Sequence, residues 1–135
     1  MGKTRLNKIK VALEEMHEGI QIIDFSWRYY YVNQAAAKHG KRLPEDLIGK
    51  TMIECYKDFE KTPVFKDLTY VMQSRKPRRI ENEFEYPNGE KRWFELFIEP
   101  FSEGILIRSI DITERKLLEE QLRHSQKLES IGRLA

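Results

Sequence analysis

The sequence predicts an α+β domain: a five-stranded antiparallel sheet with short helices on one face, an N-terminal amphipathic helix and a C-terminal coiled-coil helix. All 7 Phe, 6 Tyr and 2 Trp residues lie between Phe25 and Phe101, so the core is expected there. Turn signals divide this window into short strands with short helical segments between them. The regions before and after it carry apolar residues at heptad-like spacing, which predicts helices at both ends.

The composition restricts the class of protein. A chain of 135 residues, 40% of them hydrophobic, has the size of one ordinary domain. A net charge of +2 predicts no nucleic-acid partner, and the basic run 75–79 is interpreted as a solvated turn. Cys55 is the only cysteine, so no intrachain disulfide is expected. The absence of an apolar run of about 20 residues predicts a cytoplasmic chain without a membrane segment, and leaves membrane attachment of the parent protein open.

The first 16 residues are expected to form an amphipathic helix that contributes to a homodimer. Its apolar side chains follow the spacing of a coiled-coil seam; they are Leu6, Ile9, Leu13 and Met16. A helix this short is not stable alone. We therefore expect it to pack on the sheet or on its copy in a second chain, and we expect Gly19 to end it.

Short strands and helices come next. Two β-branched and aromatic runs, residues 20–24 and 29–32, predict a strand pair. Asn33 stands directly before a helical segment and is expected to cap it. Pro44 and Pro63 occupy positions favoured at the start of a helix, and Pro77 is expected to end the second of these helices.

The last third predicts a three-strand meander. Asn88-Gly89 separates an alternating segment, residues 80–86, from an apolar one, residues 91–101, which is the pattern of a hairpin. A further strand is expected over residues 105–112. The acidic residues of the first strand are expected to face solvent or the arginines of the other two strands, Arg92 and Arg108; they are Glu81, Glu83 and Glu85.

A charged helix is expected to leave the sheet over residues 114–135. Its leucines are the second set of candidate dimer contacts; they are Leu118, Leu122 and Leu128. Asp111 and Glu114 have the spacing of a capping box, and Thr113 is the alternative cap. We expect these three residues to couple the last strand to the helix, so that a shift in the sheet alters the arrangement of a helix pair.

Five segments resemble, in order, the successive signatures of PAS sensor domains; they are residues 19–24, 31–36, 46–50, 88–94 and 111–115. A second resemblance covers residues 125–135, which look like the lead-in to the dimerisation and phosphoacceptor helix of sensor histidine kinases.

The two resemblances imply three parts. Residues 1–16 form the N-terminal helix, residues 17–113 a PAS sensor domain, and residues 114–135 a signalling helix with the start of the dimerisation helix.

The implied function is that of a sensory and dimerising PAS module, which relays a signal to the autophosphorylation of a histidine kinase and, through it, to a response regulator. No catalysis is expected in the chain itself, since it has neither the phosphoacceptor region nor a glycine-rich phosphate loop. One alternative is a ligand-free protein-interaction module that uses the face of Trp93, Phe97 and Phe101. Another is a PAS sensor attached to a different output, such as a cyclic-dinucleotide enzyme.

No cofactor is identified. Haem-binding PAS domains present a histidine from the helix that begins near Thr62, and residues 62–74 contain none. Flavin photosensors carry a reactive cysteine shortly after the position of Gly49, from which Cys55 is offset. The resemblance therefore disfavours both haem and cysteine-linked flavin. The scattered histidines and the single cysteine have no ligand spacing for a metal.

The candidate pocket for a small molecule is the apolar space between the sheet and the short helices. Ligand pockets are largely apolar, but the same side chains also suit a filled core, which their bulk favours. The candidate lining residues are Ile22, Phe65, Leu68, Met72, Phe84, Phe94, Leu96 and Ile107.

Overall fold

A computed structural model describes the backbone of residues 2–134 and the side chains of residues 4–132. The elements are, in chain order, α1 (Gly2–Glu15), β1 (Gly19–Asp24), β2 (Tyr29–Val32), α2 (Gln34–His39), α3 (Pro44–Leu47), α4 (Met52–Cys55), the 3-10 turn η1 (Phe59–Lys61), α5 (Pro63–Ser74), β3 (Arg78–Glu85), β4 (Lys91–Phe101), β5 (Gly104–Asp111) and α6 (Thr113–Leu134).

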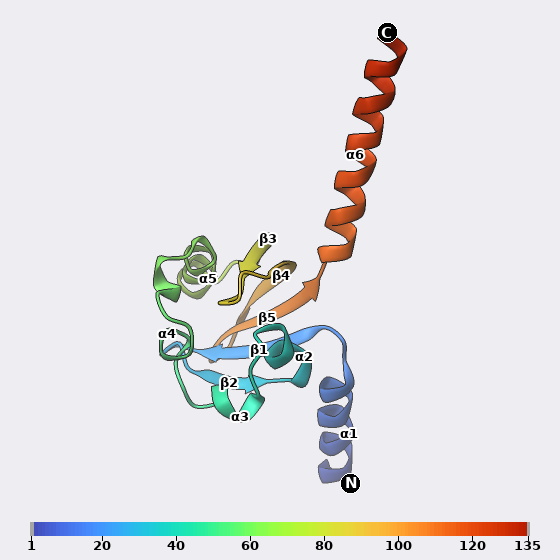
Figure 1. The fold of residues 1–135 in the computed structure, drawn as a ribbon. Helices are drawn as coiled ribbons and strands as arrows, with labels where there is room; N and C mark the ends of the chain where they lie inside the picture. Colours follow the sequence, from blue (N-terminus) through green and yellow to red (C-terminus); the bar gives the residue numbers. More distant parts are fainter. Residues whose placement is uncertain (1, 135) are drawn as a thin grey trace.

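The five strands form one antiparallel sheet in the order β2-β1-β5-β4-β3. The short helices gather on one side of it, and α1 and α6 extend away from it in opposite directions (Figure 1). The predicted α+β architecture, with helices at both ends of the chain, is confirmed. The predicted hairpin is also present, because β3 and β4 pair from Arg78↔Ile98 to Glu85↔Lys91 around the Asn88-Gly89 turn.

The core lies between the sheet and the helical layer. Ile23, Ile105 and Ile107 come from the two central strands, and Leu68 and Val71 come from α5; none is more than 2% exposed. The α5 helix begins with Pro63 at its first position, as predicted. It ends at Ser74, before Pro77 is reached. The helix stops there because Arg75 adopts a left-handed backbone conformation.

Close pairing of the central strands depends on a glycine at the start of β5. A Cβ atom on Gly104 would lie 1.8 Å from the carbonyl oxygen of Ile23. That oxygen belongs to the backbone of β1 and has no freedom to move aside. Only glycine therefore allows β5 to run along the full length of β1, from Gly19↔Ser109 to Asp24↔Gly104.

Asn33 caps α2, as predicted, and it also joins two other elements. Its Oδ1 accepts hydrogen bonds from the amides of Ala36 and Ile20, both at 2.9 Å. Its Nδ2 donates to the carbonyl oxygens of Leu13 at 2.9 Å and Glu18 at 3.0 Å. The side chain is fully buried. One amide group thus holds the end of α1, the start of β1 and the start of α2 together.

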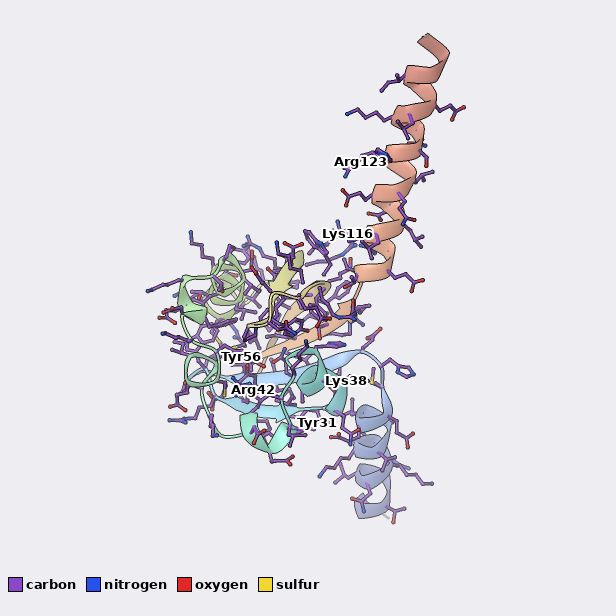
Figure 2. All side chains as sticks on the ribbon, in the orientation of Figure 1. Tyr31, Lys38, Arg42, Tyr56, Lys116 and Arg123 are labelled. Carbon is purple, nitrogen blue, oxygen red and sulfur yellow. The ribbon has the colours of Figure 1, made fainter. Side chains whose placement is uncertain are left out.

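The N-terminal helix packs mainly on α2 and meets the sheet at its edge strand, β2. The contacts of α1 are with α2, through Leu13 and the Asn33 amide, and with β2, where Tyr31 donates to Glu14 at 2.9 Å. Figure 2 shows Tyr31 on this side of the sheet. Gly19 does not end α1 but begins β1, where a Cβ would lie 2.2 Å from Ser109 Oγ. Met16 follows the last residue of α1.

The outer face of the sheet is covered by charged side chains and not by a helix. The guanidinium of Arg108 lies 4.4 Å from the ring centre of Phe97, and that of Arg79 lies 5.6 Å from it. The ammonium group of Lys116, in the first turn of α6, lies 4.9 Å from the ring centre of Trp93. These cation–π contacts leave the apolar rings only partly exposed.

The leucines of α6 whose side chains the structure describes face solvent. The exposed fractions are 57% for Leu118, 61% for Leu122 and 56% for Leu128. In α1, Leu6 and Ile9 are also more than half exposed. Within the part of the chain that the structure describes, no helix has the length and apolarity needed to cross a membrane.

Candidate functional site

A cavity of about 120 Å³ lies between the inner face of the sheet and the helical layer. Five of the eight predicted pocket residues line it; they are Leu68, Phe84, Phe94, Leu96 and Ile107. Their close packing still leaves space for a small molecule. The space is similar to the ~150 Å³ cavity of a well-studied engineered protein that binds benzene.

The other three predicted pocket residues lie elsewhere. Ile22 is on the outer face, because the inward residues of β1 are Gly19, Gln21 and Ile23, which pair with inward residues of β5. Phe65 packs its ring 4.8 Å from that of Trp27. Met72 packs against the core without reaching the cavity. Neither the spacing of apolar residues in a helix nor the run of isoleucines in β1 predicts which way these three side chains point.

Polar side chains line the cavity, and the sequence-based prediction missed all of them; they are Gln21, Tyr29, His39, Tyr56, Asn82 and Ser109. Two were detectable from period-2 alternation. Asn82 stands between Ile80 and Phe84 on one side of β3, and Gln21 stands two residues before Ile23. A polar residue in the buried register of a strand is therefore a useful signal for a polar group in a pocket.

His39 connects the cavity with a wider groove beside α1. It lines both spaces, and its Nδ1 lies 3.1 Å from Ser109 Oγ. Its ring packs 4.9 Å from that of Phe94. Burial lowers the pKa of His39 below its usual 6.5, although the nearby Asp111 carboxylate acts in the opposite direction. His39 is thus neutral at pH 7.

Lowering the pH is expected to destabilise the protein through His39. A histidine with a lower pKa in the folded chain than in the unfolded chain loses folding free energy as it gains a proton. The free energy of unfolding should therefore decrease as the pH falls below 6.5. Urea unfolding at about pH 7.5 and pH 5.5, which brackets that range, should show a smaller difference in His39→Gln than in the wild type. The exposed His17, changed to Gln, is the control. An unchanged difference in His39→Gln would contradict the assignment.

The predicted coupling residues lie where the sheet meets α6. Thr113 Oγ1 accepts a hydrogen bond from the amide of Trp93 in β4 at 2.9 Å and donates to Asp111 Oδ1 at 2.6 Å. Asp111 Oδ2 accepts from Arg92 at 2.9 Å. Burial acts to raise the pKa of Asp111, but the hydrogen bonds from Thr113 and Arg92 outweigh it and hold this pKa below its usual value. The first residue of α6 is thus fixed to both β4 and β5.

No capping box forms at this helix. Asp111 Oδ1 accepts from the amide of Thr113 at 2.9 Å. Among the described residues, no hydrogen bond joins the Glu114 side chain to the backbone of Asp111, and Glu114 is exposed. Thr113, the alternative cap, is the first residue of the helix, and its hydroxyl bonds to the Trp93 backbone and to Asp111 and, among the described residues, to no amide of the helix.

A second connection between the sheet and α6 was not predicted. Glu81 in β3 binds Lys116 at 2.5 Å and Arg115 at 2.8 Å (Figure 2 labels Lys116). The hydrogen bond from Lys116 is the main reason that the pKa of Glu81 is lowered. Glu81 is thus exposed, as expected, but its ion-pair partners are in α6 and are not Arg92 or Arg108.

The arginines expected opposite the acidic row pair elsewhere. Arg92 pairs with Glu90 and Asp111, and Arg108 pairs with Glu18. Glu83 and Glu85 are exposed.

No metal site is found in the described part of the chain, where no three His, Cys, Asp or Glu side chains gather as ligands would. Cys55 is buried in the core, and burial raises the pKa of its thiol. A thiol in that state is not activated as a nucleophile.

Comparison with known protein families identifies one match. The model of the PAS fold family matches residues 13–117, which include the sheet, the short helices and the first turn of α6. Comparison with curated protein sequences gives no significant match.

Three solved structures illustrate the similarity of fold. The PAS domain from Bordetella pertussis BvgS has 22% identity and a TM-score of 0.63, with 90% of this chain and 96% of that one covered. A domain of a sensor histidine kinase/response regulator from Geobacter sulfurreducens has 20% identity and a TM-score of 0.63, with 79% and 94% covered. The PAS domain of a LuxR-family transcriptional regulator from Burkholderia thailandensis, in complex with ethanol, has 16% identity and a TM-score of 0.59, with 76% and 96% covered.

Proposed function

Because the chain belongs to the PAS fold family, we propose that it is the sensory and dimerising module of a two-component sensor histidine kinase. A small molecule in the cavity shifts the sheet, and α6 carries the change to the kinase domains that follow. The observation that carries this proposal is the double attachment of α6 to the sheet. Thr113 holds the first turn to β4, and Glu81 holds the same turn to β3.

The geometry suits a relay because the attachments lie on the strands that also form the cavity. Phe94 in β4 and Asn82 in β3 line the cavity and stand opposite each other in the sheet. Trp93, next to Phe94, donates a hydrogen bond from its backbone amide to Thr113 Oγ1. A ligand that displaces β4 therefore displaces the start of α6, and the remaining helix transmits that displacement along its length.

The histidine-kinase output is supported by the resemblance of residues 125–135 to the lead-in of a phosphoacceptor helix. The solved domain from Geobacter sulfurreducens, which comes from a sensor histidine kinase, has the same fold. Incubation of the full-length gene product with ATP is expected to yield an acid-labile phosphohistidine that can be passed to a response regulator. Formation of a cyclic dinucleotide from GTP, without phosphoprotein, would support the alternative output instead.

Dimerisation is a separate part of the proposal, and it is argued from the exposed leucines of α6. At 100° per residue, Leu117, Leu118, Leu122 and Leu128 share one side of the helix, whereas Ser130 lies on the opposite side. Exposed leucines in a row are unfavourable in water, so a second α6 is the partner that buries them.

The chain is expected to sediment as a dimer, with twice its mass of 16.2 kDa, at concentrations well above micromolar. Leu122→Glu should shift the equilibrium to the monomer, because it places a charge in the helix pair. Ser130→Glu adds the same charge on the other side and should leave the dimer intact. A wild-type monomer at these concentrations, or equal effects of the two variants, would count against pairing through α6.

A further inference from the structure

The cavity is bordered by a hydroxyl that has no protein hydrogen-bond partner among the described residues. Tyr29 is 3% exposed and lines the cavity. Among the described residues, its Oη takes part in no hydrogen bond, whereas Tyr56 Oη donates to the carbonyl of Gly40 at 3.4 Å. No fully buried side-chain polar atom of the described residues lacks a hydrogen-bond partner, so the Tyr29 hydroxyl is accessible from the cavity. A molecule inside the cavity can therefore form a hydrogen bond with it.

Two more polar side chains, both half-buried, border the cavity. The side-chain amides of Gln21 and Asn82 line the cavity from β1 and β3, on either side of β5 and β4. Within residues 4–132 neither amide group has a protein hydrogen-bond partner. The hydroxyl of Tyr29 and these two amides supply both donors and acceptors to the same space.

The cavity offers no charge to a ligand. Among the described residues that line it, none is Asp, Glu, Lys or Arg. The ionisable groups that do line it are held neutral at pH 7: burial lowers the pKa of His39 and raises that of Tyr56 to about 12. An ion that entered this space would lose its hydration without gaining a counter-charge, which is strongly unfavourable.

The aromatic lining of the cavity favours a ring. Its walls include the aromatic rings of Tyr29, Tyr56, Phe84 and Phe94. Aromatic rings pack on one another in tilted or offset arrangements that are more favourable than their buried area alone. The volume of about 120 Å³ is close to that of the benzene-binding cavity mentioned above, so it suits one small ring.

From these four observations we infer that the cavity binds an uncharged single-ring aromatic molecule that carries a hydroxyl or carbonyl group, with the Tyr29 hydroxyl and the Gln21 and Asn82 amides as its hydrogen-bond partners. This inference rests on the sensory function proposed above and names the class of molecule that the module detects. The ring occupies the aromatic walls, and its polar group satisfies the side chains that the protein leaves without partners.

Three one-ring compounds test the inference on the 135-residue chain. Phenol has the polar group, benzene lacks it, and benzoate carries a charge at pH 7. Titration of each into ¹⁵N-labelled protein is expected to give saturable shift changes with phenol at the amides of cavity residues. Benzene should bind about tenfold more weakly, since one hydrogen bond is lost. Benzoate should cause no saturable change at these amides.

Two variants assign the polar contacts. Tyr29→Phe removes one oxygen atom and should weaken the binding of phenol, so that its advantage over benzene becomes smaller. Tyr30→Phe removes the same atom from a neighbouring residue that is 62% exposed, so it should leave the preference for phenol intact. Gln21→Met keeps the length of the side chain and should also weaken the binding of phenol. It provides an independent measurement if Tyr29→Phe does not fold.

The inference is overturned if phenol gives no saturable change, if benzoate binds as tightly as phenol, or if neither Tyr29→Phe nor Gln21→Met weakens the binding of phenol. The first result would mean that only water occupies the cavity. Failure of the sensory function is a different observation: phenol would bind as expected, but changes at Asp111 and Thr113 would leave the output of the full-length protein unaltered.

Discussion

Asn33→Ala is expected to lower the free energy of unfolding by about 3 kcal/mol or more, because a buried donor or acceptor that loses its partner costs roughly 1–3 kcal/mol. Four groups lose their partner at once. The amides of Ile20 and Ala36 lose the Oδ1 acceptor, and the carbonyls of Leu13 and Glu18 lose the Nδ2 donors. Since single domains have a total stability of about 5–15 kcal/mol, much of the fold would be lost.

Urea unfolding followed by tryptophan fluorescence measures this loss. Gln34→Ala is the matched control, since Gln34 is the next residue in the chain and is exposed. It should change the free energy of unfolding by less than about 0.5 kcal/mol, as exposed positions usually do. Equal, small effects of Asn33→Ala and Gln34→Ala would mean that the four hydrogen bonds do not hold α1, β1 and α2 together.

Thr113→Val is expected to release the first turn of α6 from the sheet. Valine has nearly the same shape as threonine but lacks the hydroxyl, so the amide of Trp93 and the carboxylate of Asp111 each lose a partner. A loss of about 1–3 kcal/mol at this attachment corresponds to an increase in local opening of roughly 5- to 150-fold. The amides of the first turn, including that of Lys116, which donates to Ile112, should exchange faster by a factor in this range.

Hydrogen exchange followed by NMR resolves these amides from the rest of the chain. Thr113→Ser retains the hydroxyl and should retain most of the protection. Amides of β1, which has no contact with Thr113, serve as an internal reference. If Thr113→Val left the first turn as well protected as in the wild type, the attachment through Glu81 alone would be sufficient, and Thr113 would not couple the sheet to α6.

The order of elements and most of their boundaries were predictable from the sequence because each signal is local. Asn88-Gly89 specifies a hairpin through backbone conformation, and Pro44 and Pro63 mark helix starts through their fixed torsion angle. Asn33 was recognised as a cap from the helical segment that follows it. Its two donor bonds were not predictable, because their acceptors lie 15 and 20 residues away in the chain.

The candidate site was predicted less completely, because it depends on which side of the sheet each residue faces. The hydrophobicity of Ile22 predicts a pocket position. The register of β1 instead turns Gln21 inward and Ile22 outward. The lining residues that were not predicted are polar, so hydrophobicity does not identify them. Glu81 illustrates the same difficulty on the outer face, since nothing in the spacing of residues 81–85 indicates that its partners are in α6.

In the histidine kinase proposed above, autophosphorylation of the full-length protein tests the central claim, the relay from the sheet to α6, most directly. We expect Asp111→Ala and Thr113→Ala each to change the basal rate, the stimulated rate or both, because each removes hydrogen bonds between the last strand and the helix. Glu103→Gln, at an exposed position in the turn between β4 and β5, should leave both rates as in the wild type. Basal and stimulated rates that remain unchanged in both Asp111→Ala and Thr113→Ala would contradict the account.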